Sequence, residues 1–212
     1  MTAEQAGPGI GSPQVRAARP GEAALLGDAL ADAFAEDPVF AWLIPPRVRG
    51  RDRRMRTFFT SMSRSYLRQG KPCYVAGDGS AAALWAPPGG WALPGGQVVL
   101  EAAPAAQAFR GRLLRALRVQ MQIERLHTGH GTPHWYLGYL GTRHGQQSQG
   151  LGTGLLREVL AGADASGVPA YLESSNERNL PLYERNGFRV VGELRALGRG
   201  PAIWRMWRDP CQ

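Results

Sequence analysis

The sequence is poor in cysteine and has no long hydrophobic run. Its 212 residues include two cysteines, Cys73 and Cys211. Two thiols are too few for the disulfide framework of a small secreted protein, so we expect a reducing, cytoplasmic location. No apolar run approaches the roughly 20 residues of a membrane-spanning helix, so no membrane partner is expected. The N-terminus also lacks the basic start and apolar stretch of a secretory signal.

Lysine is almost absent, although the chain is basic. Lys71 is the sole lysine, so the net charge of +8 comes from arginine. The arginines peak in one segment, at Arg47, Arg49, Arg51, Arg53, Arg54 and Arg56. Such a cluster can attract phosphates, which leaves nucleic-acid binding as a less favoured alternative. The same segment heads an apolar stripe with helical spacing, formed by Met55, Phe58, Phe59, Met62 and Tyr66. We therefore favour a solvated helix face above a core stripe.

Composition predicts one globular domain. Hydrophobic residues make up 43% and charged residues 20%, which is ordinary for a chain long enough to bury a core. We expect a disordered tail at 1–12, a single domain at 13–208 and a short tail at 209–212.

Periodicity and turn residues predict a mixed α/β chain without internal repeats. The expected strands are 14–18, 71–75, 81–85, 134–140, 170–174, 188–194 and 202–208. The first expected helix, 22–35, is stopped by Asp37 and Pro38. The other expected helices are a segment that ends near 67, 98–127 with a break at Pro104, one that starts near 151, and 180–186.

A glycine-rich loop, Gln147-Ser148-Gln149-Gly150-Leu151-Gly152-Thr153-Gly154, lies between an expected strand and an expected helix. Glycines let the backbone approach a ligand closely, and the N-terminus of a helix stabilises an anion. The loop therefore predicts a pyrophosphate site. A Walker loop is excluded because Gly150 is followed by Leu151 rather than by Lys and Ser or Thr. A dinucleotide fingerprint fits poorly because its glycine spacing differs, although Glu173 lies roughly 20 residues further on.

The segment Gln147–Gly152 resembles the pyrophosphate loop of GNAT acyltransferases, and Glu173–Phe188 resembles the second signature of that family. His134–Leu137, Gly167–Glu173, Arg178–Pro181 and Gly200–Trp204 look like the puromycin N-acetyltransferase branch, while Ala33–Pro38 carries the likeness in the N-terminal half. Ser148 and Gln149 depart from that branch, where glycine and a basic residue are more common. The resemblance implies a mostly antiparallel, splayed sheet flanked by helices.

The resemblance also implies acetyl-CoA as cosubstrate, without a metal. Its coenzyme would lie between the strand that ends near Gly141 and the strand that ends near Glu173. The matching coenzyme-binding residues are Tyr139, Gly141, Thr142, Gln147, Gln149, Gly150, Gly152, Thr153, Gly154, Asn176 and Asn179.

Direct acyl transfer needs an oxyanion donor, a base and an acid. In the family, a backbone N–H of the central strand polarises the thioester carbonyl, and Leu140 or its neighbour Tyr139 matches that position. Tyr183 matches the acid that protonates the departing thiolate. Glu173 ends its strand facing the expected cleft and is our candidate base, with His134 and Tyr139 as alternatives.

The expected acceptor is a primary amine on a small molecule. The puromycin-like branch suggests an amine-bearing antibiotic, but fold kinship does not define a ligand. The candidate acceptor contacts are Phe40, Trp42, Trp85, His134, Trp135 and Trp204. A homodimer is compatible with these expectations.

Two other interpretations stay open. His127, His130 and His134 have a spacing that could suggest a metal site, but the segment lacks cysteine and is rich in glycine, so we expect none. A non-catalytic acyl-CoA sensor would keep the glycine loop and would not depend on Tyr183.

Overall fold

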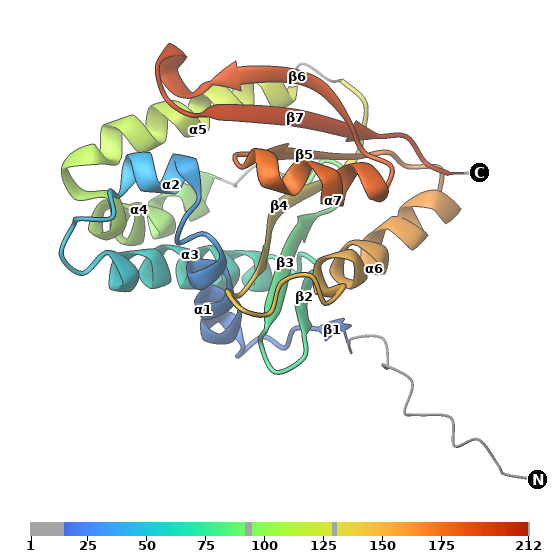
Figure 1. Cartoon of the computed structure of the whole chain (residues 1–212), viewed down its shortest axis with the longest axis horizontal. Coiled ribbons are helices and arrows are strands. Elements are labelled where there is room, and N and C mark those ends of the chain that lie inside the picture. Colours follow the sequence, from blue (N-terminus) through green and yellow to red (C-terminus); the bar gives the residue numbers. More distant parts are fainter. Residues whose placement is uncertain (1–14, 92–94, 129–130, 212) are drawn as a thin grey trace, which may run out of the picture.

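The computed structural model describes residues 15–91, 95–128 and 131–211, and these residues form a seven-stranded sheet flanked by helices (Figure 1). The expected tail at 1–12 lies outside the described residues. The strands are β1 Val15–Ala17, β2 Cys73–Ala76, β3 Ala81–Ala86, β4 Trp135–Thr142, β5 Ala170–Ser174, β6 Arg189–Arg195 and β7 Ala202–Arg208. The α-helices are α1 Ala23–Ala33, α2 Pro38–Leu43, α3 Arg51–Arg68, α4 Gly95–Phe109, α5 Leu113–Thr128, α6 Leu151–Ala165 and α7 Leu180–Arg185. Short 3-10 turns are η1 Arg110–Arg112, η2 Glu177–Asn179 and η3 Ala196–Gly198.

The sheet has the order β1-β2-β3-β4-β5-β7-β6, and β4 and β5 are its parallel pair. That pair is short, because it runs only from Trp135 opposite Ala170 to Leu137 opposite Leu172. Beyond these residues both strands continue but are no longer paired with each other. A bulge interrupts the register between β3 and β4, where Leu84 faces Tyr139 and Trp85 faces Leu137. The predicted splayed and mostly antiparallel sheet is therefore confirmed.

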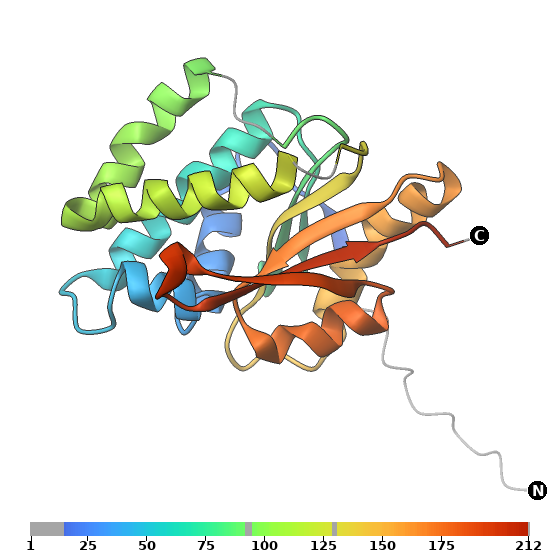
Figure 2. The ribbon, with the colours of Figure 1, turned by 90° about the horizontal axis from the view of Figure 1, so that it is seen from above.

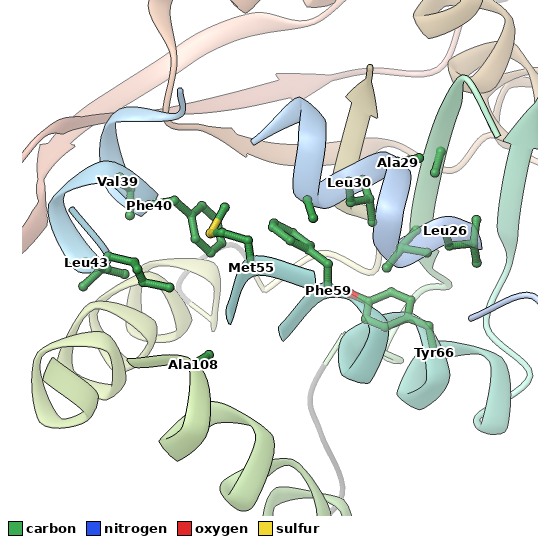
Figure 3. Close-up of a cluster of buried hydrophobic side chains, with 14 of the residues drawn as sticks. Leu26, Ala29, Leu30, Val39, Phe40, Leu43, Met55, Phe59, Tyr66 and Ala108 are labelled. Carbon is green, nitrogen blue, oxygen red and sulfur yellow. The ribbon is translucent and has the colours of Figure 1, made fainter. Parts of the chain in front are cut away.

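Helices cover both faces of the sheet (Figure 2). The helices α1 to α5 pack one apolar cluster against the face that carries Leu84, and Phe59 and Leu30 are fully buried there. The helices α6 and α7 pack a second cluster against the other face, around Trp85 and Leu155. We call these the α3 face and the α6 face. Figure 3 shows the α3-face cluster, with Tyr66 at one end of it.

Two helical expectations were wrong in detail. Asp37 and Pro38 end the first helix but also start α2, because the Asp37 carboxylate caps the amides of Val39 and Phe40 at 2.9 and 3.0 Å. The segment 98–127 breaks at Arg110, whose φ is 46°, whereas Pro104 lies inside α4.

The arginine-headed segment forms α3 as expected. Met55 and Phe59 are buried, Arg56 lies 3.8 Å from Asp28, and Arg51 is buried with its Nε donating to the carbonyl of Ile44 at 2.7 Å. In the described part of the chain, no helix is long and apolar enough to cross a membrane.

Candidate functional site

A cleft of about 630 Å³ opens where β4 and β5 separate, on the side of the glycine loop. Its walls come from the end of α1, the end of β4, the loop before α6, and the segment from η2 to α7. The lining residues are Ala33, Phe34, Glu36, Asp37, Leu140, Gly141, Thr142, His144, Gln146, Gln147, Ser148, Gly150, Leu151, Gly152, Thr153, Asn176, Arg178, Asn179, Leu182, Tyr183 and Arg185.

The glycine loop ends at the N-terminus of α6. Gly150 is the N-cap in the left-handed region with φ 79°, and the amide of Gly154 makes a helical bond to its carbonyl at 2.9 Å. The amides of the first helical turn before Gly154 precede the helical ladder, so they are available to an anion at this helix end. Gly152 belongs to that turn, and a Cβ there would come within 3.2 Å of Leu182. The cleft therefore has a cradle for an anionic group at this end.

The loop is held in place from α1. The amide of His144 donates to Asp32 Oδ2 at 2.7 Å, and the His144 ring lies 3.2 Å from the same oxygen. Ser148 takes a left-handed conformation with φ 64°, which is costly for a residue with a Cβ. Glycine, which is more common at this position in the puromycin branch, would adopt the same conformation without strain.

The other end of the cleft holds Tyr183 and Asp37. Tyr183 is buried at 6% exposure and packs edge-on against Phe188. Asp37 is also buried, and the hydroxyl of Ser175 donates to its Oδ2 at 2.5 Å. Burial, followed by the nearby charge of Asp37, raises the pKa of the Tyr183 phenol well above its usual value. Tyr183 is therefore protonated at neutral pH.

Glu173 lies on β5 directly after the last residue paired with β4. Its Oε1 is buried and has no hydrogen-bond partner among the described residues. Burial raises the pKa of Glu173 to about 7, although the phenols of Tyr136 and Tyr171 and the charge of Arg205 oppose the rise. A carboxyl with this pKa can accept a proton near neutral pH.

The structure brings most of the predicted coenzyme residues together. Predicted residues that line the cleft are Leu140, Gly141, Thr142, Gln147, Gly150, Gly152, Thr153, Asn176, Asn179 and Tyr183. Gly154 follows Thr153 in α6 and lies outside the lining. Gln149 is exposed, and its Nε2 lies 3.4 Å from Gln146 Oε1. Tyr139 points to the α3 face, where its ring meets Phe34 and Phe59. The functional roles of these residues stay predictions.

The predicted acceptor contacts do not converge on the cleft. Trp85 and Trp135 belong to the α6-face cluster, and Phe40 is buried in the α3-face cluster. The guanidinium of Arg115 lies over the Trp42 ring, 4.7 Å from its centre. Trp204 on β7 is paired with Ser174 on β5. These side chains lie outside the cleft lining, so their contact with an acceptor stays a prediction.

His134 and His127 form a buried pair, with their Nε2 atoms 2.8 Å apart. The Nδ1 of His134 donates to the carbonyl of Thr132 at 2.6 Å, so in the neutral ring Nε2 accepts a hydrogen bond from the Nε2–H of His127. Burial lowers the pKa of His134. The described residues contain no group of three or more His, Cys, Asp or Glu side chains that could hold a metal, and His130 lies outside them.

Sequence reasoning missed Asp37 and Tyr66 as site residues. Asp37 was interpreted as a helix stop, and the available signal was that a carboxylate before proline is also an N-cap. Tyr66 was assigned to the core stripe of its helix, and it does lie there. Burial raises the pKa of Tyr66, and the charge of Glu173 adds to the rise. Tyr66 and Glu173 come near each other only because segments far apart in sequence pack together.

The chain resembles known acetyltransferases. Residues 108–188 match the acetyltransferase (GNAT) family model. An uncharacterized N-acetyltransferase of Schizosaccharomyces pombe, C550.08, is 41% identical over 54 residues, which are 26% of this chain and 22% of that protein. The chain thus matches less than a quarter of the length of this curated relative.

Two solved structures resemble the whole fold. One is described as histone acetyltransferase HPA2 and related acetyltransferase from Corynebacterium glutamicum, with 26% identity, a TM-score of 0.65, and 95% of this chain and 98% of that chain covered. The other is a polyamine N-acetyltransferase of Drosophila melanogaster that forms N-acetylagmatine, with 18% identity, a TM-score of 0.63, and 92% and 99% covered. Part of the chain thus matches the GNAT family model, and its fold is similar to that of these acetyltransferases.

Proposed function

We propose that this protein is an acetyl-CoA-dependent N-acetyltransferase that acetylates a primary amine of a small molecule by direct attack. One observation carries the proposal: a single cleft has helix N-terminal amides at one end and the buried Tyr183 phenol at the other. A cleft of this kind orients a long anionic carrier and supplies an acid where its acyl end would lie.

The residues at the anionic end fit a coenzyme diphosphate. The α6 amides would donate to phosphate oxygens, and Gly152 leaves room for a close approach. Arg178 and Arg185 on the cleft wall add positive charge. Asn176 and Asn179 would hold the pantetheine arm. Acetyl-CoA, when bound, supplies the activated acyl thioester.

The central strand supports charge stabilisation at the reacting carbon. Beyond Leu137 the edge of β4 that faces β5 has no strand partner there, so its N–H groups point into the gap. We assign Leu140, or its neighbour Tyr139, to this donation. A fixed N–H aimed at a developing oxyanion stabilises the transition state more than the ground state.

Two side chains would manage the protons. Glu173, with its pKa of about 7, would take a proton from the amine, directly or through water. Tyr183 would protonate the departing thiolate, and the raised pKa of its phenol keeps that proton in place until it is needed. Asp37 supports this role because its charge adds to the pKa shift.

The acceptor class rests on family likeness. The Drosophila protein forms N-acetylagmatine, and the chain's own signatures resemble the puromycin branch. A small amine is therefore the expected acceptor, with an antibiotic amine as one candidate. A cytoplasmic location and a homodimer also stay predictions, and the free thiols of Cys73 and Cys211 agree with the former.

The test is thiol release from acetyl-CoA in the presence of a panel of aminonucleosides, aminoglycosides, polyamines, agmatine and phenylethylamine. We expect at least one amine to accelerate release, and Tyr183→Phe to lower kcat by about 10²-fold with unchanged coenzyme affinity in calorimetry. Tight coenzyme binding without turnover of any amine would instead favour a sensor. Weak coenzyme binding with salt-steep binding to DNA or RNA would favour a nucleic-acid-binding protein.

A further inference from the structure

On the α3 face, the gap between β4 and β5 ends in a group of buried and half-buried polar side chains. Tyr66 reaches it from α3, Tyr136 from β4, and Tyr171 and Glu173 from β5. Tyr136 and Tyr171 interact with the Glu173 carboxyl through their phenols, and the charge of Glu173 acts on the phenol of Tyr66. We call these four residues the tyrosine–glutamate nest. Figure 3 shows the Tyr66 ring among the buried side chains of α1 and α3.

Gly138 explains how Tyr66 reaches this point. It follows Leu137, the last β4 residue paired with β5, and it is the extra residue at the bulge opposite β3. A Cβ at this position would lie 2.3 Å from the Tyr66 hydroxyl. Glycine weakens a central strand, so its use here corresponds to a close approach of another group. The missing side chain admits the hydroxyl of Tyr66 to the apex of the gap.

One carboxylate oxygen of the nest is unsatisfied within the described part of the chain. Glu173 Oε1 is buried and without a hydrogen-bond partner among the described residues, which is costly for a carboxylate oxygen. Arg205 faces Glu173 across β5 and β7, and the Lys71 Nζ lies 4.9 Å from the Tyr66 ring centre. Neither cation comes within 4.0 Å of Glu173 as an ion pair in the described structure. The Oε1 atom of Glu173 therefore remains available to a donor from outside.

We propose that the tyrosine–glutamate nest binds the nitrogen of the acceptor amine, and that Tyr66 contacts this nitrogen beside Glu173. The inference rests on the proposed function and makes its acceptor more specific. A primary ammonium has three N–H donors and no acceptor, and the nest offers one carboxylate and several phenol oxygens. Secondary and tertiary amines have fewer donors and more bulk. The acceptor is therefore an unhindered primary amine whose nitrogen lies beside Glu173 in the gap between β4 and β5.

The first experiment compares Tyr66→Phe with Tyr74→Phe. Tyr74 is half-buried on β2, packs against the α6-face cluster and serves as the matched control. Loss of one hydrogen bond to a charged group predicts a rise in KM for the amine of about tenfold or more in Tyr66→Phe. The coenzyme dissociation constant should stay the same in both variants. An unchanged amine KM in Tyr66→Phe would overturn the inference.

The second experiment tests the approach at Gly138. In Gly138→Ala the new Cβ would meet the Tyr66 hydroxyl, so we expect a higher amine KM and a lower Tm. In Gly138→Ala/Tyr66→Phe the nearest remaining ring atom would be 3.2 Å away, so part of the Tm should return while the amine KM stays as in Tyr66→Phe. Additive losses of Tm would contradict the proposed contact between these two residues.

Failure of the proposed function would be seen separately. If the wild-type protein acetylates no amine of the panel, that proposal fails. The nest is then tested by calorimetry, with phenylethylamine and agmatine titrated into protein saturated with coenzyme A. Binding that weakens about tenfold in Tyr66→Phe but not in Tyr74→Phe would support the nest. No binding, or equal binding in all three proteins, would overturn it.

Discussion

The two sides of the β4–β5 gap are built in different ways. On the side of α6, the cleft is lined by residues that lead into this helix, among them Gln147, Gly150 and Gly152, and by the exposed Arg178 and Arg185. On the α3 face, the nest presents side chains from α3, β4 and β5, of which Tyr66 and Tyr171 are buried and Tyr136 and Glu173 are half-buried. The open side can change its ligand affinity with little effect on the core. The buried side joins ligand binding to stability, because its polar groups lack full solvation.

The largest expected effect is on the open side, in Gly152→Asp. A carboxylate in the first turn of α6 would face the coenzyme diphosphate, and like charges in contact cost several kcal/mol. We expect the coenzyme dissociation constant to rise by about 10²-fold or more, measured by calorimetry. The unfolding free energy should change little, since the new Cβ meets only the flexible end of Leu182.

Gly162→Asp is the matched control for this charge. Gly162 lies on the same helix with open space around it, outside the cleft lining. Its coenzyme affinity should stay near that of the wild-type protein. Equal losses in both variants would mean that net charge, and not the cradle, sets affinity.

The second-largest effect is expected on the buried side, in Glu173→Gln. The Glu173 pKa of about 7 exceeds the ordinary value of 4.5, so the folded state holds a proton between these pH values that the unfolded state has lost. Wild-type stability should therefore fall as pH rises through this window, by up to about 3 kcal/mol. Glutamine cannot ionise, so the variant should be more stable than the wild type at pH 8 and nearly equal at pH 4.

Urea unfolding at both pH values measures this difference, with Glu158→Gln on the exposed side of α6 as control. The same Glu173→Gln protein should transfer acetyl groups about 10²-fold more slowly. A variant that is both stable and fully active would remove Glu173 from the mechanism. A variant that is less stable than the wild type at pH 8 would contradict the raised pKa of the Glu173 carboxyl.

The smallest effect is expected in Ser148→Gly. Glycine would relieve the left-handed conformation at this loop position but would also loosen the unfolded chain. These opposing terms leave a net change within about 1 kcal/mol in unfolding free energy, which a Tm measurement can follow. Coenzyme affinity should change less than about threefold. A much larger loss would mean that the Ser148 side chain itself contacts the coenzyme.

The open side of the gap was predictable from the sequence because it is local. The glycines at 150 and 152 and the helix that follows lie within one short segment, and β5 was found with its bounds. Periodicity also identified the strands on either side of Gly77 and Gly79. In such segments, neighbouring residues decide the conformation, so a pattern is enough.

The buried side was not predictable in the same way. Tyr66 and Gly138 are 72 positions apart in the sequence, and their contact depends on how α3 packs against the sheet. Trp42, Trp85 and Trp204 are predicted acceptor contacts on residue type alone, and residue type does not tell whether an aromatic side chain packs in a core or lines a pocket. The helical segment breaks at Arg110 and not at Pro104 for a similar reason. Tertiary packing decides where the chain turns, and a proline in the sequence does not by itself mark that position.

The pairing of β3 with β4 has a consequence for how this chain can be divided. The family match begins at residue 108, inside α4, and so includes β4 but neither β3 nor the strands before it. A fragment cut at that boundary would leave β4 with an uncovered hydrogen-bonding edge, a template for aggregation. It would also lack α3, whose tyrosine fills the space above Gly138. Residues 108–188 are thus a sequence signature of the protein, and we do not expect them to fold as an independent unit.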